Sequence, residues 1–177
     1  MHLINQQILV DKCVNREIKA QKEFYTLFAR KMMGVCVRYA SDIDEAKDFM
    51  QEGFIKVFNS IDKFNNSGSL EGWVRRIIVN TCLMELRKVK PIFNEIENLN
   101  IQSEQVFTYM NEKDILMFIQ KLPQGFRMVF NLFAIEGYSH KEIAERLNIS
   151  EGTSKSQYSR SRQALQNMIK EEQRKSA

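Results

Sequence analysis

The segment SHKEIAERLNISEGTSKSQYSRSRQAL, residues 139–165, has the pattern of two helices joined by a sharp turn. Ser139 and Glu142 are spaced as a capping box, which predicts that a helix begins there. Asn148 stands where the chain must turn, because asparagine tolerates a left-handed backbone better than most residues. Ser150 then predicts the start of a second helix. The segment therefore predicts a helix-turn-helix.

The beginning of the second predicted helix is small, polar and basic. A helix with such a surface can enter the major groove of DNA and reach the edges of the bases. The cations Lys155, Arg160 and Arg162 are expected on its exposed side, where they can neutralise phosphates. The alternative is an ordinary antiparallel helix pair with a solvated basic face, and this segment alone leaves that alternative open.

The whole chain is predicted to be all-α. Its 177 residues include only 7 Gly and 2 Pro, whereas a protein of many short strands normally needs more turn-forming residues. Apolar residues recur at helical spacing in 14–40, 42–61 and 70–89, and again from about 108 to 135. Residues 90–107 lack this periodicity. We therefore expect two small helical domains, 1–89 and 108–177, joined by a flexible linker at 90–107.

Composition also bears on the class of protein. Cys13, Cys36 and Cys82 are far apart, and both histidines stand alone, so neither a disulfide scaffold nor a metal site is predicted. We expect buried, unreactive thiols and a reducing, cytoplasmic location. No run of about 18 apolar residues is present, so no membrane span is expected, and the N-terminus does not read as a secretory signal. The net charge of +4 permits an anionic partner.

Residues 64–88 combine aromatic and basic side chains around an Asn- and Ser-rich loop at 65–69. Such a loop beside a basic helix suits a single strand, because unstacked bases can enter the loop while the backbone follows the cations. The alternative is that the aromatic residues belong to the core. We expect this for Trp73, because a small domain needs its largest side chain inside.

Acidic residues recur at helical spacing just after residue 41, where Ser41 is expected to cap a helix: Asp42, Asp44, Asp48 and Glu52. A calcium loop is excluded, because its sixth and twelfth positions would be Lys47 and Gly53 instead of Gly and Glu. The acidic face suits either a solvated helix start or a docking surface for a partner helix, edged by Phe54, Val57 and Phe58.

These three segments, in this order, resemble the extracytoplasmic-function (ECF) group of the sigma-70 family of bacterial RNA polymerase sigma factors. EAKDFMQEGFIKVF at 45–58 is similar to the family's segment that docks on the clamp helices of the polymerase. LEGWVRRIIVN at 70–80 is similar to its promoter-opening helix, and residues 122–162 look like the domain that reads the minus-35 element. Lys47, Gly53 and Met84 depart from the residues usual in the family.

The resemblance implies a sigma factor that binds core RNA polymerase and directs promoter recognition and transcription initiation, without enzyme activity, cofactor or metal. The implied contacts with the clamp helices are Asp48, Gln51, Glu52, Phe54 and Phe58. The implied contacts with melted minus-10 DNA are Phe64, Asn65, Asn66, Ser67, Arg76 and Asn80. The implied contacts with duplex minus-35 DNA are Thr153, Lys155, Ser156, Gln157, Ser159 and Arg160. An anti-sigma factor is a common partner in this group.

Two other functions are compatible with parts of the sequence. A stand-alone helix-turn-helix transcriptional regulator with an N-terminal ligand or dimerisation domain would form a stable dimer on a palindromic site. A helical enzyme using Asp44, Asp48 or Glu52 would lose turnover in the variant Asp48→Asn.

Overall fold

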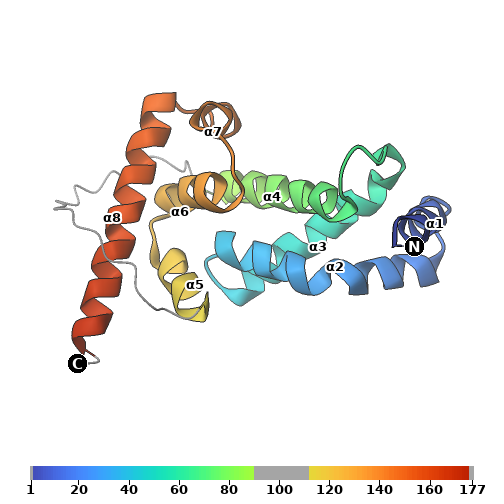
Figure 1. The fold of residues 1–177 in the computed structure, drawn as a ribbon, viewed down its shortest axis with the longest axis horizontal. Helices are drawn as coiled ribbons and strands as arrows, with labels where there is room; N and C mark the ends of the chain where they lie inside the picture. Colours follow the sequence, from blue (N-terminus) through green and yellow to red (C-terminus); the bar gives the residue numbers. More distant parts are fainter. Residues whose placement is uncertain (1, 90–111, 176–177) are drawn as a thin grey trace. The chain divides into compact units, whose positions relative to one another are not determined.

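The structure, a computed structural model, describes residues 2–89 and 112–175. Every regular element within these two ranges is a helix, which confirms the predicted all-α fold (Figure 1). The chain divides into two compact units, residues 1–89 (the N-terminal unit) and residues 90–177 (the C-terminal unit). The predicted linker at 90–107 lies outside the described residues.

The N-terminal unit is a helical bundle in which the second, third and fourth α-helices each pack against the other two. Its elements are α1 (His2–Val14), α2 (Ile18–Tyr39), α3 (Ile43–Asn59), the short 3-10 helix η1 (Ile61–Lys63) and α4 (Leu70–Val89). The apolar residues that recur at helical spacing in α2, α3 and α4 form the core, among them Phe24, Met32, Tyr39, Val57, Val74 and Ile78. α1 packs against α2 and η1 at one end of this bundle.

The first turn of α3 begins one residue later than the sequence suggested. Asp42, not Ser41, is the N-cap: Asp42 Oδ1 accepts hydrogen bonds from the backbone N–H groups of Asp44 and Glu45, at 2.9 and 2.8 Å. Glu45 in turn accepts from the N–H of Ser41 at 2.5 Å. The predicted cap at Ser41 is therefore wrong, because a carboxylate at position 42 takes the amides that the Ser41 hydroxyl was expected to bind.

Gly53 lies where α3 packs closely against α4. A Cβ atom added to Gly53 would overlap Ile78 Cδ1 and would lie 3.6 Å from Ile78 Cα. Both residues are buried, and Ile78 has no exposed surface. A larger residue at position 53 would force the Ile78 side chain to move, which gives a structural reason for this departure from the usual family pattern.

The C-terminal unit packs shorter helices against one long one. Its elements are α5 (Glu112–Lys121), α6 (Gln124–Phe130), a π-helical turn η2 (Asn131–Ile135), α7 (His140–Leu147) and α8 (Glu151–Lys175). The core joins α5 and α6 to α8 and consists of Phe118, Ile119, Leu122, Phe126, Ala164, Leu165 and Ile169. Gly137, with φ = 77°, adopts the left-handed conformation, which glycine takes without steric cost.

Other features of the described residues bear on the function classes considered above. All three cysteines are buried, as expected, and the hydrogen bond between Cys82 and Cys36, together with burial, raises the pKa of Cys82 well above its usual value. Protonated, buried thiols are poor nucleophiles. None of the helices described has the length and apolar composition that crossing a bilayer requires.

Candidate nucleic-acid and polymerase interfaces

Three local features that the sequence predicted form the helix-turn-helix: a capping box, a left-handed turn residue and a second helix cap. The Ser139 hydroxyl accepts from the N–H of Glu142, and the Glu142 carboxylate accepts from the Ser139 N–H at 2.8 Å, which completes the capping box. Asn148 has φ = 54° and ψ = 51°, the left-handed conformation that turns the chain. Ser150 Oγ then accepts from the N–H of Thr153 at 2.9 Å and starts α8, the recognition helix.

The recognition helix presents a polar and basic face to its surroundings. Lys155, Ser156 and Ser159 are exposed, and Thr153 and Arg160 are half-buried. Lys155 Nζ lies 2.7 Å from Glu151 Oε1 one turn away, and its hydrogen bond to that carboxylate lowers the pKa of Glu151. This ion pair is exposed to water, so a phosphate can compete for the lysine at little cost.

The structure does not place Gln157 on this face. Gln157 is only 6% exposed, and it lies on the same side of α8 as Ser154 and Ser161, which are fully buried. The expectation that Gln157 contacts DNA is therefore wrong. Its position on the inward side, three residues from Ser154 and four from Ser161, decides its burial, although its side chain is polar.

A ring cluster that the sequence analysis missed holds the recognition helix. The rings of Phe133 and His140 stack with centroids 4.2 Å apart at 12°, and Phe133 also contacts Tyr158 with centroids 4.4 Å apart. His140 Nδ1 lies 2.9 Å from the hydroxyl of Ser154. Side chains from η2, α7 and α8 thus meet at one point, and only the turn and capping residues of this region had a sequence signal.

The loop before α4 exposes the polar residues predicted to take a base. Asn65, Asn66 and Ser67 are all exposed. Asn65 Oδ1 accepts from both the N–H and the hydroxyl of Ser67, at 3.1 and 2.6 Å, and Asn66 has φ = 59°. These bonds hold the loop in a defined, left-handed turn that leaves its side chains at the surface.

Two aromatic residues flank this loop in the chain and contact each other. Phe64 and Trp73 are both half-buried, and their ring centroids are 5.6 Å apart. The expectation that Trp73 is a core residue is therefore wrong in part: one side of the indole packs and the other reaches the surface.

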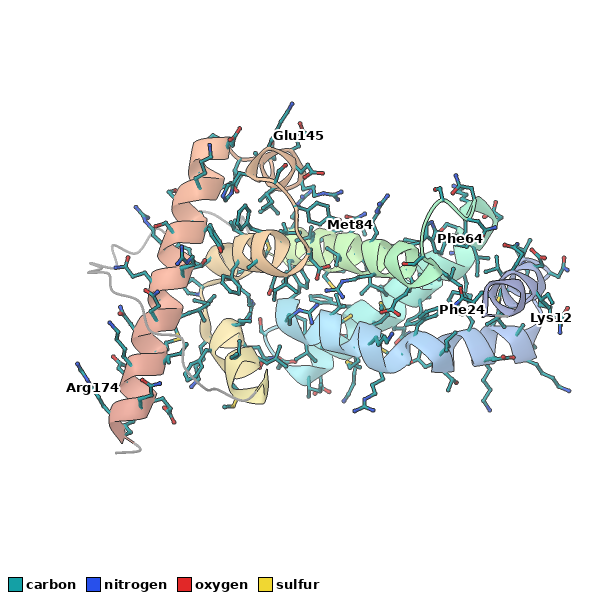
Figure 2. All side chains as sticks on the ribbon, in the orientation of Figure 1. Lys12, Phe24, Phe64, Met84, Glu145 and Arg174 are labelled. Carbon is teal, nitrogen blue, oxygen red and sulfur yellow. The ribbon has the colours of Figure 1, made fainter. Side chains whose placement is uncertain are left out.

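One side of α4 carries an exposed polar and basic row. Arg76, Asn80, Met84 and Arg87 recur on it and are all exposed. Met84, labelled in Figure 2, is 41% exposed. Its sulfur lies 3.8 Å from Lys56 Nζ on α3. Because no carboxylate stands at position 84, this side of the helix keeps the full positive potential of its arginines.

The acidic face of α3 lies beside an apolar hollow. Asp48, Gln51 and Glu52 are exposed on α3, as a docking role requires. Next to them is a hollow of about 400 Å³ between α2 and α3, lined by Tyr25, Met33, Lys47, Met50, Gln51, Phe54, Ile55 and Phe58.

The two phenylalanines expected to edge this face differ in exposure. Phe54 is only 3% exposed, and its ring packs against Tyr25 with centroids 4.7 Å apart. Phe54 therefore forms part of the floor of the hollow and does not protrude. Phe58 is half-buried at its side.

Comparisons with known proteins agree with this arrangement. The family model for sigma-70 region 2 matches residues 24–91, and the model for sigma-70 region 4 matches residues 112–165. The chain is 27% identical over 185 residues to the ECF RNA polymerase sigma factor SigW of Bacillus subtilis, covering 93% of this chain and 99% of that protein. It is 27% identical over 182 residues to the ECF RNA polymerase sigma-E factor of Escherichia coli K12, covering 94% and 95%.

A solved structure has the same fold. The sigma factor RpoE from Bartonella quintana, solved in complex with the anti-sigma factor NepR, matches with a TM-score of 0.54 and 23% identity, over 84% of this chain and 96% of that one. Both sigma-70 regions are thus present, in order, in a chain of the length of its relatives. The chain belongs to the ECF group of the sigma-70 family, the subunits with which RNA polymerase recognises promoters and initiates transcription.

Proposed function

We propose that the two units divide the work of promoter recognition. The N-terminal unit docks on the clamp helices of core RNA polymerase and captures melted minus-10 DNA, and the C-terminal unit reads the minus-35 element. The observation that carries this proposal is the composition of the N-terminal unit, which has an exposed acidic face on α3 and an exposed basic row on α4. Two surfaces of opposite charge suit two different partners.

The docking surface consists of Asp48, Gln51 and Glu52 with the neighbouring apolar hollow. An apolar centre with polar residues at its edge is the usual anatomy of a protein interface. Phe58 supplies apolar surface at its side, while Phe54 supports the floor from below. A basic partner helix would bury the hollow and pair with the carboxylates.

The minus-10 surface consists of the loop and the row on α4. Asn65, Asn66 and Ser67 offer amide and hydroxyl groups to an extruded base, and the paired rings of Phe64 and Trp73 flank the loop. Arg76 and Asn80 lie further along α4, where the backbone of the melted strand would run.

The minus-35 surface is the exposed side of the recognition helix. Lys155 and Arg160 are the expected phosphate contacts, and Thr153, Ser156 and Ser159 are the expected groove contacts. Gln157 is not part of this surface, because it is buried.

Each DNA contact is weak when it acts alone. A few cations give modest affinity that falls steeply with salt, whereas two contacts held by one large partner gain from effective concentration. We therefore expect weak promoter binding by the isolated chain and tight, specific binding with core polymerase. Gel shifts at physiological salt with and without core test this, and tight specific binding by the isolated chain contradicts it.

The docking residues are tested separately by charge reversal. Asp48→Arg and Glu52→Arg should weaken association with core polymerase in a pull-down and leave the helical circular-dichroism spectrum unchanged. Asp62→Arg, a reversal at another exposed acid of the same unit, is the matched control. Unchanged association in the first two variants refutes the assignment of the acidic face.

The alternative of a stand-alone regulator makes a different prediction. Such a protein would form a stable dimer and bind a palindromic site without polymerase. A monomer by light scattering, together with core-dependent transcription, excludes it.

The proposed docking on core polymerase also leads to expectations about where the protein acts and how it is regulated. A polymerase subunit acts where the polymerase is, so we expect this chain in the cytoplasm. An anti-sigma factor would act by covering the docking surface, in competition with core polymerase.

A further inference from the structure

The N-terminal helix α1 makes a direct contact with the base-capture loop. Asn66 Nδ2 donates a hydrogen bond of 2.5 Å to Gln7 Oε1, although the two residues are 59 positions apart in the chain. α1 also packs against η1, which leads into this loop, and Figure 1 shows α1 at the same end of the N-terminal unit. The match to the sigma-70 region 2 model starts at residue 24, so α1 lies before it.

A carboxylate fixes the direction of this contact. Gln7 Nε2 donates to Asp11 Oδ1 one turn along α1, at 2.6 Å. An ionised carboxylate can only accept hydrogen bonds, so Gln7 must turn its amide nitrogen to Asp11 and its oxygen to the loop. That oxygen can only accept as well, so Asn66 must turn Nδ2 toward α1. Asp11 therefore fixes the amide orientation of Gln7, and Gln7 fixes the amide orientation of Asn66.

The consequence concerns what Asn66 offers to a ligand. With one Nδ2 hydrogen held by Gln7, its Oδ1 and its second Nδ2 hydrogen are the groups left for a base. This acceptor and this donor together can pair with a donor and an acceptor on the edge of a base. If the Asn66 amide were turned over, the acceptor and the donor would exchange positions. The neighbouring Asn65 differs, because its Oδ1 is taken by Ser67.

α1 also forms one wall of a hollow next to the loop. This hollow of about 540 Å³ is lined by Gln6 of α1, by residues of α2 that include Lys31, by Ser69 of the loop, and by the start of α4, which includes Gly72 and Arg75. Its volume is in the range of small-ligand sites, and its lining carries Arg75 together with the ion pair between Lys31 and Glu71. An extruded nucleotide at the loop would therefore have α1 on one side.

We propose that α1 completes the base-capture site and that Gln7, held by Asp11, is a positioning residue that sets the base preference of Asn66. The inference rests on the proposed role of the loop in capturing a minus-10 base. Gln7 acts through Asn66 and is not itself expected to touch the DNA. Its removal should reduce the base preference at one promoter position, and should leave docking on core polymerase unchanged.

The test uses the full chain with core polymerase on promoters that carry each of the four bases at every minus-10 position. Asn66→Ala and Gln7→Ala should reduce the preference at the same single position. A reduction of about 5-fold or more is expected, the lower end of what one base-reading amide contributes. Ile8→Ala, an exposed neighbour on α1, is the matched control and should keep the preference.

A polarity swap separates positioning from simple support of the loop. Gln7→Glu alone puts two carboxylates one turn apart and should reduce the preference. The double variant Gln7→Glu/Asp11→Asn lets an amide at position 11 donate to a carboxylate at position 7, which still accepts from Asn66. It should therefore restore the wild-type preference, whereas loss of preference in the double variant contradicts the inference.

These measurements separate the role of the loop in base capture from the positioning role of Gln7. If Asn66→Ala leaves every base preference intact, the proposed role of the loop fails. If Asn66→Ala removes the preference and Gln7→Ala does not, the loop keeps its role and the positioning role of Gln7 is overturned.

Discussion

His140, at the start of α7, is joined to Ser154 on the recognition helix by a hydrogen bond of 2.9 Å between Nδ1 and Oγ. Ser154 has no exposed surface, and the ring of His140 is stacked on Phe133. This partly buried bond therefore links the two helices of the helix-turn-helix. Because it fixes the first helix against the second, it also fixes the face that the second helix presents to DNA.

Removing the histidine nitrogen should weaken this junction. His140→Phe keeps an aromatic ring for the stack and leaves the buried Ser154 hydroxyl without its partner. We expect a loss of about 1 kcal/mol in the free energy of unfolding, measured by urea denaturation, and reduced transcription from promoters that depend on the minus-35 element.

The double variant His140→Phe/Ser154→Ala provides the control. It removes both partners, so no buried polar group remains unpaired, and its loss should be smaller than the sum of the two single losses. Strictly additive losses would show that the two side chains do not interact.

Gln157 should behave as a core residue. Its Oε1 atom is buried and has no hydrogen-bond partner among the described residues. Gln157→Met keeps the length of the side chain and removes this unpaired oxygen, so the free energy of unfolding should stay the same or rise by up to about 1 kcal/mol. Recognition of the minus-35 element should be unchanged, as measured by transcription from promoters with altered minus-35 sequences.

Lys155→Ala is the matched comparison on the exposed side of the same helix. It should weaken promoter binding about equally across sequences and lower the salt dependence of binding by about one phosphate contact. If Gln157→Met reduces recognition and Lys155→Ala does not, the exposed face of the recognition helix has been assigned wrongly.

Features that depend on neighbouring residues could be predicted from the sequence. Ser139, Asn148 and Ser150 act on backbone groups within a few positions, so their spacing alone indicates a cap, a turn and a second cap. The shift of the α3 cap from Ser41 to Asp42 shows the limit of this reasoning. Two adjacent residues could each cap the helix, and only the backbone decides between them.

Features that depend on distant residues could not be predicted in this way. The polarity of Gln157 suggested an exposed contact, and the packing of α8 against the rest of the unit buries it. His140 and Ser154 are 14 positions apart, and Gln7 and Asn66 are 59 apart, so no spacing rule connects them. Each pair comes together only when two helices, or a helix and a loop, have packed.

The capping box of α7 should contribute stability that depends on pH. Hydrogen bonds from the Ser139 hydroxyl and backbone N–H lower the pKa of Glu142 in the folded chain. A lowered pKa means that the contribution is fully present above the unfolded value, about 4.3, and is lost as the pH falls through the folded value. Glu142→Gln should therefore be less stable than wild type at pH 7, and urea denaturation at pH 7 and below pH 4 should show this difference shrinking in acid.

Ser139→Ala tests the other half of the capping box. It removes the acceptor for the Glu142 N–H and should cost about 1 kcal/mol. A stability difference between Glu142→Gln and wild type that stays constant with pH would contradict the assigned hydrogen bonds.

The Cδ1 methyl group of Ile78 should decide whether position 53 can hold a residue larger than glycine. Gly53→Ala adds a Cβ that overlaps Ile78 Cδ1, and overpacking of this kind costs roughly 1–3 kcal/mol, against a gain of about 1 kcal/mol in helix propensity. Ile78→Val removes the overlapping Cδ1 and alone should cost about 1 kcal/mol. The double variant should be more stable than the two single losses predict, because the alanine then occupies the space that the methyl group left. Additive losses in urea denaturation would show that α3 and α4 adjust their spacing freely, in which case Gly53 would not set the distance between the acidic face and the basic row.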